Sequence, residues 1–126
     1  MGKILIVDDA SLIRLVADKA AKGAGHDTVL AENGEEGLAA LENNQVDLIF
    51  SDINMPVMGG LEMVEIIKSN PSYKFIPIVM LTTESNPALK EQGKALGVKA
   101  WLLKPFNKDK FLLAVTKLLG WYYETR

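Results

Sequence analysis

The stretch Leu48-Ile49-Phe50-Ser51-Asp52-Ile53-Asn54-Met55-Pro56 decides how the fold of this chain is interpreted. An apolar run of strand length reaches one carboxylate, Asp52, and a Met-Pro pair follows shortly after it. Proline cannot donate to the hydrogen-bond ladder of a sheet, and the residue before it avoids helical backbone angles. We therefore expect a strand over Val46–Ser51 that ends near Asp52 and leaves this side chain at the rim of a sheet.

Other apolar segments end in polar residues in the same way. They are Ile4–Val7 before Asp8-Asp9, Ile78–Leu81 before Thr82-Thr83, and Ala100–Leu103 before Lys104-Pro105. The carboxyl ends of parallel strands lie along one edge of a sheet, and open α/β folds bind their ligands at that edge. We therefore expect these polar residues to gather around Asp52.

Strand-like and helical segments alternate along the chain. The expected strands are Lys3–Val7, Asp27–Ala31 (nearer an edge), Val46–Ser51, Ile76–Leu81 and Ala100–Leu103. Such alternation favours a parallel sheet with right-handed crossovers and helices on both faces. The predicted fold class is α/β, a (βα)5 doubly wound parallel five-stranded sheet with the flavodoxin-like order 2-1-3-4-5. We expect one domain over 1–120, followed at 121–126 by a short C-terminal tail or the start of a linker.

Capping residues and apolar spacing place the helices. Ser11 is expected to cap the first helix. Its expected buried face consists of Ile13, Val16, Ala17 and Ala20. Asn86-Pro87 opens a later helix, and its few large apolar residues predict that it is the least anchored one. Asn107 caps the last helix, and Gly120 is expected to end it.

Two single residues stand apart from these patterns. Gly37 lies inside the helix that follows the Asn33-Gly34 turn, where it should cost roughly 1 kcal/mol relative to alanine. His26 is the one histidine of the chain, and we expect it to be a surface residue without a catalytic role.

Composition limits the classes of protein. The chain has 126 residues, 48% of them hydrophobic and 24% charged, which suits one globular domain. It has no cysteine, which excludes disulfides and thiolate metal sites, and its net charge of −2 argues against direct nucleic-acid binding. No segment has the length and apolarity of a membrane span, and the N-terminus lacks a signal-peptide pattern. We expect a cytoplasmic protein without membrane insertion.

Three acids from adjacent strands repel one another unless a positive charge compensates them. Oxygen ligands with room for water suit Mg²⁺, so we expect Asp8, Asp9 and Asp52 to form a magnesium site. Lys104 adds a second positive charge at this rim, and the proline after it allows a cis peptide bond. Thr82 offers a hydroxyl donor at the same edge.

The motifs that carry this chemistry occur in a familiar order and spacing. They are Ile6-Val7-Asp8-Asp9, Asp52-Ile53-Asn54-Met55-Pro56-Val57-Met58-Gly59-Gly60, Leu81-Thr82-Thr83 and Lys104-Pro105-Phe106. In this combination the sequence resembles a CheY-like response-regulator receiver domain of two-component signalling, close to the single-domain chemotaxis type. The resemblance covers essentially the whole chain.

The resemblance implies a phosphoacceptor and a metal site. It makes Asp52 the residue that is phosphorylated. Asp9, Asp52 and the backbone carbonyl of Asn54 would bind Mg²⁺ directly, and Asp8 would bind it through water.

The resemblance also implies roles for residues around this centre. Thr82 and Lys104 would hold the phosphoryl oxygens, while Thr82 and Trp101 would form the switch. Asn54 and Glu84 stand at positions that can tune dephosphorylation.

As partners, the resemblance implies a histidine kinase or a phosphotransfer protein as donor and a downstream protein as target. The switching face would be formed by the helix after Asn86, the strand Ala100–Leu103 and the helix after Asn107. Such a protein is not an enzyme beyond self-catalysed phosphotransfer and autodephosphorylation. We expect a monomer or a weak, phosphorylation-dependent dimer.

Three other interpretations are weighed against this one. In the first, the chain is a receiver fragment of a larger hybrid kinase or transcription factor. In the second, it is an aspartyl-nucleophile phosphatase. In the third, it is a flavodoxin-like cofactor binder. A phosphatase of this type needs a general acid where the amide Asn54 stands. A flavodoxin-like cofactor binder would need a phosphate-binding loop after the first strand, but Asp8-Asp9 stand there and their charges repel phosphate.

Overall fold

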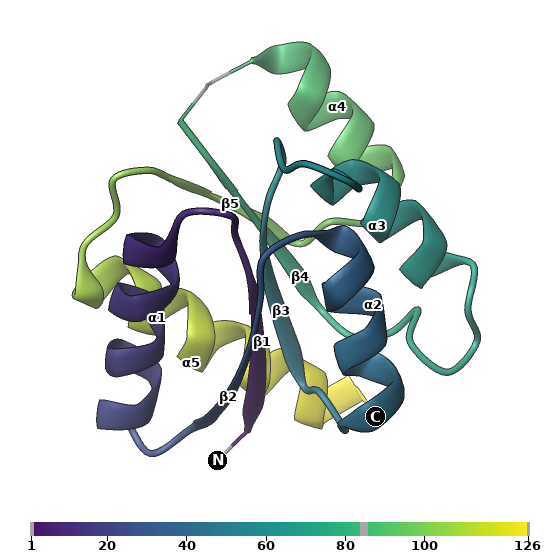
Figure 1. Ribbon diagram of the computed structural model, residues 1–126. Coiled ribbons are helices and arrows are strands. Elements are labelled where there is room, and N and C mark those ends of the chain that lie inside the picture. The colour runs from purple at the N-terminus through teal and green to yellow at the C-terminus, as the bar shows by residue number, and fades with distance from the viewer. Residues whose placement is uncertain (1, 84–85, 126) are drawn as a thin grey trace.

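The computed structural model describes residues 2–83 and 86–125 as a five-stranded sheet between two layers of helices (Figure 1). Its elements in chain order are β1 (Lys3–Val7), α1 (Ser11–Gly23), β2 (Asp27–Ala31), α2 (Gly34–Asn43), β3 (Leu48–Asp52), α3 (Gly60–Lys68), β4 (Ile78–Thr82), α4 (Pro87–Ala95), β5 (Ala100–Leu103) and α5 (Lys108–Thr125). Strands and helices alternate throughout, as the sequence predicts.

The sheet is parallel, with the strand order β2-β1-β3-β4-β5. This confirms the predicted α/β class, the doubly wound (βα)5 arrangement and the edge position of β2. Val7 pairs with Ser51, and Asp52 pairs with Leu81, so β1, β3 and β4 end almost level at one edge of the sheet.

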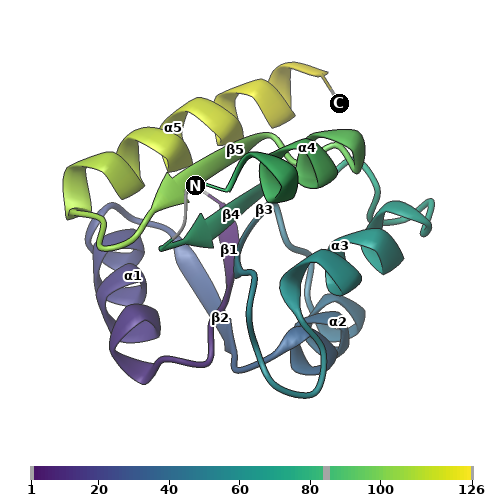
Figure 2. The ribbon, with the colours of Figure 1, turned by 90° about the horizontal axis from the view of Figure 1, so that it is seen from above.

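Each face of the sheet has its own core (Figure 2). α1 and α5 cover one face, where the rings of Phe50 and Phe111 are 4.6 Å apart. α2, α3 and α4 cover the other face, where Met63 and Met80 are fully buried. Successive residues of a strand point to opposite faces, so Ile49 and Phe50 belong to different cores.

Two strands begin later than the sequence pattern suggests. β3 starts at Leu48 rather than Val46, and β4 starts at Ile78 rather than Ile76. Both predicted starts are buried, which explains why apolar patterning included them. Pro77 lacks the N–H that a ladder needs, so regular pairing of β4 begins only after it.

α1 differs from the prediction at its start and on its inner face. Ala10 is the N-cap and no side chain caps the helix, so the predicted Ser11 cap is wrong. The Ala10 N–H donates instead to the carboxylate of Asp8, at 2.9 Å. The buried residues of α1 are Ala17, Ala20 and Ala21. Val16 is 39% exposed, because the small alanines make the face that approaches the sheet.

α5 continues past Gly120 to Thr125, so the predicted helix end is wrong. A Cβ at Gly120 would meet nothing within 4 Å, which shows that neither a turn nor a close contact requires glycine there. The added turns are anchored in part by Trp121, whose ring lies 4.1 Å from Lys99 Nζ. That residues 121–126 lead into a linker stays a prediction.

The expectations for Gly37 and His26 also change. A Cβ at Gly37 would lie 2.7 Å from Met63 Sδ, so this glycine permits the close packing of α2 on α3. His26 is half-buried, and its Nδ1 accepts a hydrogen bond from the backbone N–H of Gly2 at 3.2 Å. It is therefore a structural residue rather than a free surface histidine.

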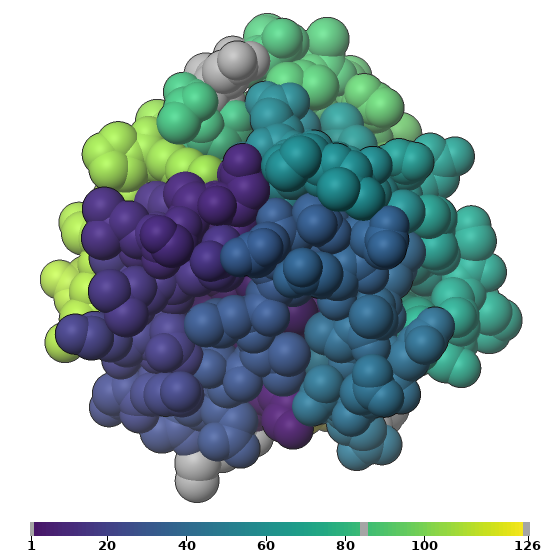
Figure 3. All heavy atoms as spheres, viewed as in Figure 1, coloured from purple at the N-terminus to yellow at the C-terminus, as the bar shows by residue number. Residues whose placement is uncertain are grey.

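The space-filling view shows α1 and α2 on either side of the β2 edge (Figure 3). Among the helices formed by residues 2–83 and 86–125, none is long and apolar enough to cross a membrane.

Candidate functional site

Three carboxylates meet at the carboxyl edge of the sheet. Asp8 and Asp9 follow β1, Asp52 ends β3, and one ligand oxygen of each lies within 4.8 Å of the others. β1 and β3 are neighbours, and the pairing of Val7 with Ser51 sets the end of β1 beside Asp52. The structure thus brings together the three acids that the sequence singles out.

Asp8 is completely buried. Its Oδ1 accepts a hydrogen bond from the Ala10 N–H, and its backbone carbonyl accepts one from Arg14 Nη1 at 2.6 Å. Its Oδ2 forms an ion pair with Lys104 Nζ at 2.7 Å, but it accepts no aligned hydrogen bond from any described residue. The ammonium of Lys104 compensates the charge of this oxygen, and its remaining lone pair can accept a hydrogen bond from a water molecule.

Lys104 bridges two of the acids from the end of β5. Its Nζ lies 2.7 Å from Asp8 Oδ2 and 3.3 Å from Asp52 Oδ1, and the side chain is 11% exposed. Its backbone N–H donates to the carbonyl of Thr82 at 2.7 Å, and the Lys104–Pro105 bond is cis. One ammonium group cannot neutralise three carboxylates, so the cluster retains a negative charge.

The electrostatic environment of Asp52 reflects that imbalance. Burial raises the pKa of Asp52, and the charge of Asp8 raises it further. Two groups act against this rise and lower the pKa of Asp52. They are the charged Lys104 and the Ile53 N–H, which donates to Asp52 Oδ1 at 2.8 Å. A second cation beside the carboxylates would relieve the remaining repulsion.

A tight turn supports Asp52 from the side of α3. The N–H of Gly60, the first residue of α3, donates to the carbonyl of Ile53 at 2.8 Å. A Cβ on Gly60 would overlap the Asp52 carbonyl and approach Met80. Glycine therefore allows α3 to begin this close to the strand end. Sequence reasoning missed this requirement, for which the Gly59-Gly60 pair was the available signal.

Thr82 and Trp101 lie on the same face of the sheet. Met80 pairs with Trp101 and Thr82 pairs with Leu103, so Thr82 follows Met80 on the face covered by α4. Thr82 is 6% exposed, and Trp101 is half-buried. Trp101 Cζ2 lies 2.5 Å from the position that a Cβ on Gly93 of α4 would occupy. Trp101 thus packs under α4, and its contact with Gly93 was not predicted from the sequence.

The remaining predicted site residues are less informative. Asn54 is exposed in the loop between β3 and α3. Glu84 lies outside the described residues. Arg14 was not predicted at all, yet it donates to the Asp8 carbonyl and pairs with Glu32 at 3.4 Å. The sequence carries no signal for this role, because the half-burial of Arg14 is visible only in the structure.

The chemistry of the cluster fits Mg²⁺. Asp8, Asp9 and Asp52 offer only oxygen donors, which are the ligands that this ion prefers. Asp9 is exposed, so water can reach the cluster and complete a coordination sphere. The negative charge that remains on the cluster beside the single ammonium of Lys104 favours a cation here.

Comparison with known proteins identifies the family. The response regulator receiver domain matches residues 4–116. This chain belongs to that family. Receiver domains are signalling proteins of two-component systems rather than conventional enzymes. As a family they bind Mg²⁺ at an acidic pocket and interact with histidine kinases and downstream targets.

Individual relatives show both short and long chains. The receiver is 36% identical to the chemotaxis protein CheY homolog of Campylobacter jejuni, over 94% of this chain and 92% of that protein. The structure of chemotaxis protein CheY4 of Vibrio cholerae superposes with a TM-score of 0.89 at 42% identity, covering 94% of this chain and 98% of that one. The DNA-binding transcriptional regulator NtrC of Salmonella typhimurium is 35% identical over 98% of this chain but only 26% of its own length.

Proposed function

We propose that this receiver domain accepts a phosphoryl group on Asp52 from a histidine kinase or a phosphotransfer protein, in a Mg²⁺-dependent reaction. Phosphorylation then alters the face formed by α4, β5 and α5 and thereby controls a partner protein. The observation that carries this proposal is the convergence of Asp8, Asp9 and Lys104 on Asp52 at the carboxyl edge of the sheet.

In the transfer step, a carboxylate oxygen of Asp52 forms a bond to phosphorus. The bond from phosphorus to the histidine nitrogen of the donor breaks, and that nitrogen keeps the electron pair. The Lys104 ammonium, 3.3 Å from Asp52 Oδ1, is placed to attract an oxygen of the incoming group. Thr82, at the end of the adjacent strand β4, supplies a hydroxyl for another phosphoryl oxygen.

The residues that would hold the metal are Asp9, Asp52 and the backbone carbonyl of Asn54, with Asp8 acting through water. When bound, Mg²⁺ supplies positive charge that offsets the charge of the phosphoryl oxygens. The fit of the oxygen donors and the excess negative charge of the cluster support this assignment.

The switch would couple the phosphoryl group to α4. If the Thr82 hydroxyl moves toward the phosphoryl group, it leaves space on the α4 side of the sheet, and the Trp101 indole moves partly into that space. The shared face of Thr82 and Trp101 supports this coupling. The contact of the indole with Gly93 gives the movement a direct route to α4.

The output arrangement follows one of two patterns among the relatives. Some relatives have about this length, whereas the receiver is about a quarter of the regulator NtrC. The controlled partner is therefore a separate protein or another domain of a longer chain. Asn54 and Glu84 are proposed to tune the lifetime of the phosphorylated state.

Acetyl phosphate and p-nitrophenyl phosphate together test this function. With Mg²⁺, acetyl phosphate should label the protein with one phosphoryl group, and chelation of the ion should abolish the label. Sustained turnover of p-nitrophenyl phosphate should be absent. Many turnovers per protein molecule would instead favour an aspartyl phosphatase.

A further inference from the structure

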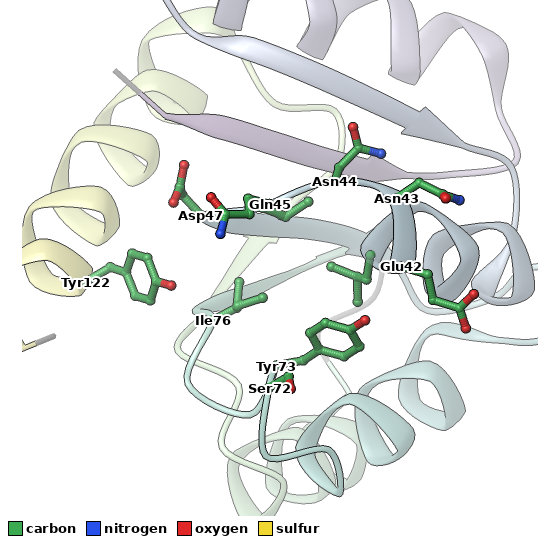
Figure 4. A pocket seen from close by; sticks show the side chains of 11 residues that line it. Glu42, Asn43, Asn44, Gln45, Asp47, Ser72, Tyr73, Ile76 and Tyr122 are labelled. Atoms are coloured by element: carbon green, nitrogen blue, oxygen red, sulfur yellow. The ribbon is translucent and has the colours of Figure 1, made fainter.

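Side chains tie neighbouring segments together at both ends of the sheet. At the amino ends of β3 and β4 lies a cavity of about 480 Å³ whose lining includes Tyr73, Tyr122 and Asp47 (Figure 4). The Asp47 carboxylate accepts the backbone N–H of Lys3 at 2.9 Å, which ties the start of β1 to the segment before β3. At the carboxyl edge the corresponding tie comes from an arginine, and it holds a carbonyl group of the acidic cluster.

The side chain of Arg14 reaches from α1 back to the end of β1. Its Nη1 donates to the backbone carbonyl of Asp8 at 2.6 Å. Its Nη2 lies 3.4 Å from Oε1 of Glu32, the residue that follows β2, and 15% of the arginine side chain is exposed. A short hydrogen bond from a charged donor in a largely buried place is strong, so Arg14 fixes the direction of this carbonyl.

The carbonyl that Arg14 holds lies directly before a proposed metal ligand. A peptide unit is planar, so the Asp8 carbonyl and the Asp9 amide turn together. The Asp8 carboxylate has fixed partners of its own, the Ala10 N–H and Lys104. Asp9 is exposed and has little packing around it, so the direction of its side chain depends on this peptide plane.

The charge of Arg14 acts in the opposite sense. A guanidinium close to the acidic cluster repels a divalent cation and competes with it for negative charge. Glu32, whose side chain is 62% exposed, offsets the arginine charge only in part. Loss of positioning would weaken Mg²⁺ binding, whereas loss of the positive charge alone would strengthen it. The sign of the change therefore distinguishes the two effects.

We propose that Arg14 is a positioning residue for the metal site. By holding the Asp8 carbonyl, it directs the Asp9 carboxylate toward Asp52 and raises the affinity for Mg²⁺. The inference rests on the proposed magnesium site of the receiver and adds to it a residue that is not a ligand. Arginine suits this position because its two terminal nitrogens reach the carbonyl and Glu32 together, whereas a lysine has a single nitrogen for both.

Mg²⁺ titrations of Arg14→Met and Arg14→Lys at constant ionic strength test this inference. The amide NMR signals of residues 8–10 and 52–54 report binding to the folded protein, so a change in stability alone does not alter the dissociation constant. Arg14→Met should raise that constant about tenfold, as is typical when a group that orients a metal ligand is lost. Arg14→Lys should lie between Arg14→Met and the parent protein, because its single nitrogen can still donate to the Asp8 carbonyl.

Lys19→Met is the matched control for charge, because Lys19 is an exposed cation of the same helix. This variant should not weaken Mg²⁺ binding. Parent-like or tighter binding by Arg14→Met, or a loss of the same size in Lys19→Met, would overturn the inference. Parent-like binding by Arg14→Lys would overturn it as well, which keeps the test decisive if Arg14→Met does not fold.

The outcomes separate the role of Arg14 from the proposed function. If the parent protein binds Mg²⁺ and takes up one phosphoryl group, and the Arg14 variants bind the ion equally well, only the role of Arg14 is lost. A parent protein that binds no Mg²⁺ would contradict the metal site itself, and the positioning role with it.

Discussion

The indole of Trp101 lies against Gly93, with Cζ2 2.5 Å from the place where a Cβ of residue 93 would be. Gly93 is the buried residue of α4, so this contact is a principal attachment of the helix to the sheet. The missing side chain of the glycine makes room for an aromatic residue as large as tryptophan.

Gly93→Ala should therefore destabilise the domain even though alanine favours helices. The added methyl group displaces the indole or α4, which costs about 1–3 kcal/mol of unfolding free energy for an overpacked contact. Denaturant unfolding measures this change. Gly120→Ala is the matched control, because open space surrounds that position and alanine should stabilise α5 there by up to about 1 kcal/mol. The same sign of change in both variants would contradict the packing account.

The switch predicts a fluorescence response of Trp101. Beryllofluoride mimics a phosphoryl group, so its addition with Mg²⁺ should move the indole and change its emission. The measurement belongs in a Trp121→Phe background, since Trp121 also emits. Thr82→Ala should abolish the response. A response that survives this substitution, or none despite demonstrated binding, would make Trp101 a packing residue only.

The metal site predicts unequal effects of the two acids after β1. Asp9 is exposed, whereas Asp8 already binds Lys104 and the Ala10 N–H. Asp9→Asn should therefore weaken Mg²⁺ binding more than Asp8→Asn, as a titration followed by NMR or calorimetry can measure. Equal losses would count against the proposed ordering of the ligands.

His26 predicts a pH dependence of stability. Burial is the largest cause that lowers its pKa in the folded protein, and the Gly2 N–H donates to its neutral Nδ1. Its contribution is thus present above the unfolded pKa of about 6.5 and is lost as pH falls through the lower folded value. His26→Gln should reduce the loss of unfolding free energy between about pH 7.5 and pH 5 relative to the parent protein. An unchanged pH profile would show that His26 stays neutral in both states or titrates equally in both.

Apolar patterning predicted the five strands, their order and the edge at which the acids meet, because buried parallel strands have a strong sequence signature. It placed β1, β2 and β5 correctly and started β3 and β4 too early, since Val46 and Ile76 are buried without belonging to the ladder. The continuation of α5 past Gly120 was missed, because one exposed glycine weakens a helix without ending it.

At the site, strand-end positions were enough to predict that Asp8, Asp9 and Asp52 converge. The glycine contacts were not predictable in this way. Gly60 approaches Asp52 only after α3 has packed on β3, and Gly93 approaches Trp101 only after α4 has packed on β5. Sequence spacing records which residues share a face, but it does not record how closely two backbones approach.

The most direct test of the account is the intact mass of the protein after incubation with acetyl phosphate and Mg²⁺. The account predicts the addition of one phosphoryl group to the parent protein, and none to Asp52→Asn or after removal of Mg²⁺. Labelling of Asp52→Asn at the stoichiometry of the parent protein would contradict it, because the phosphoryl group would then reside on another residue.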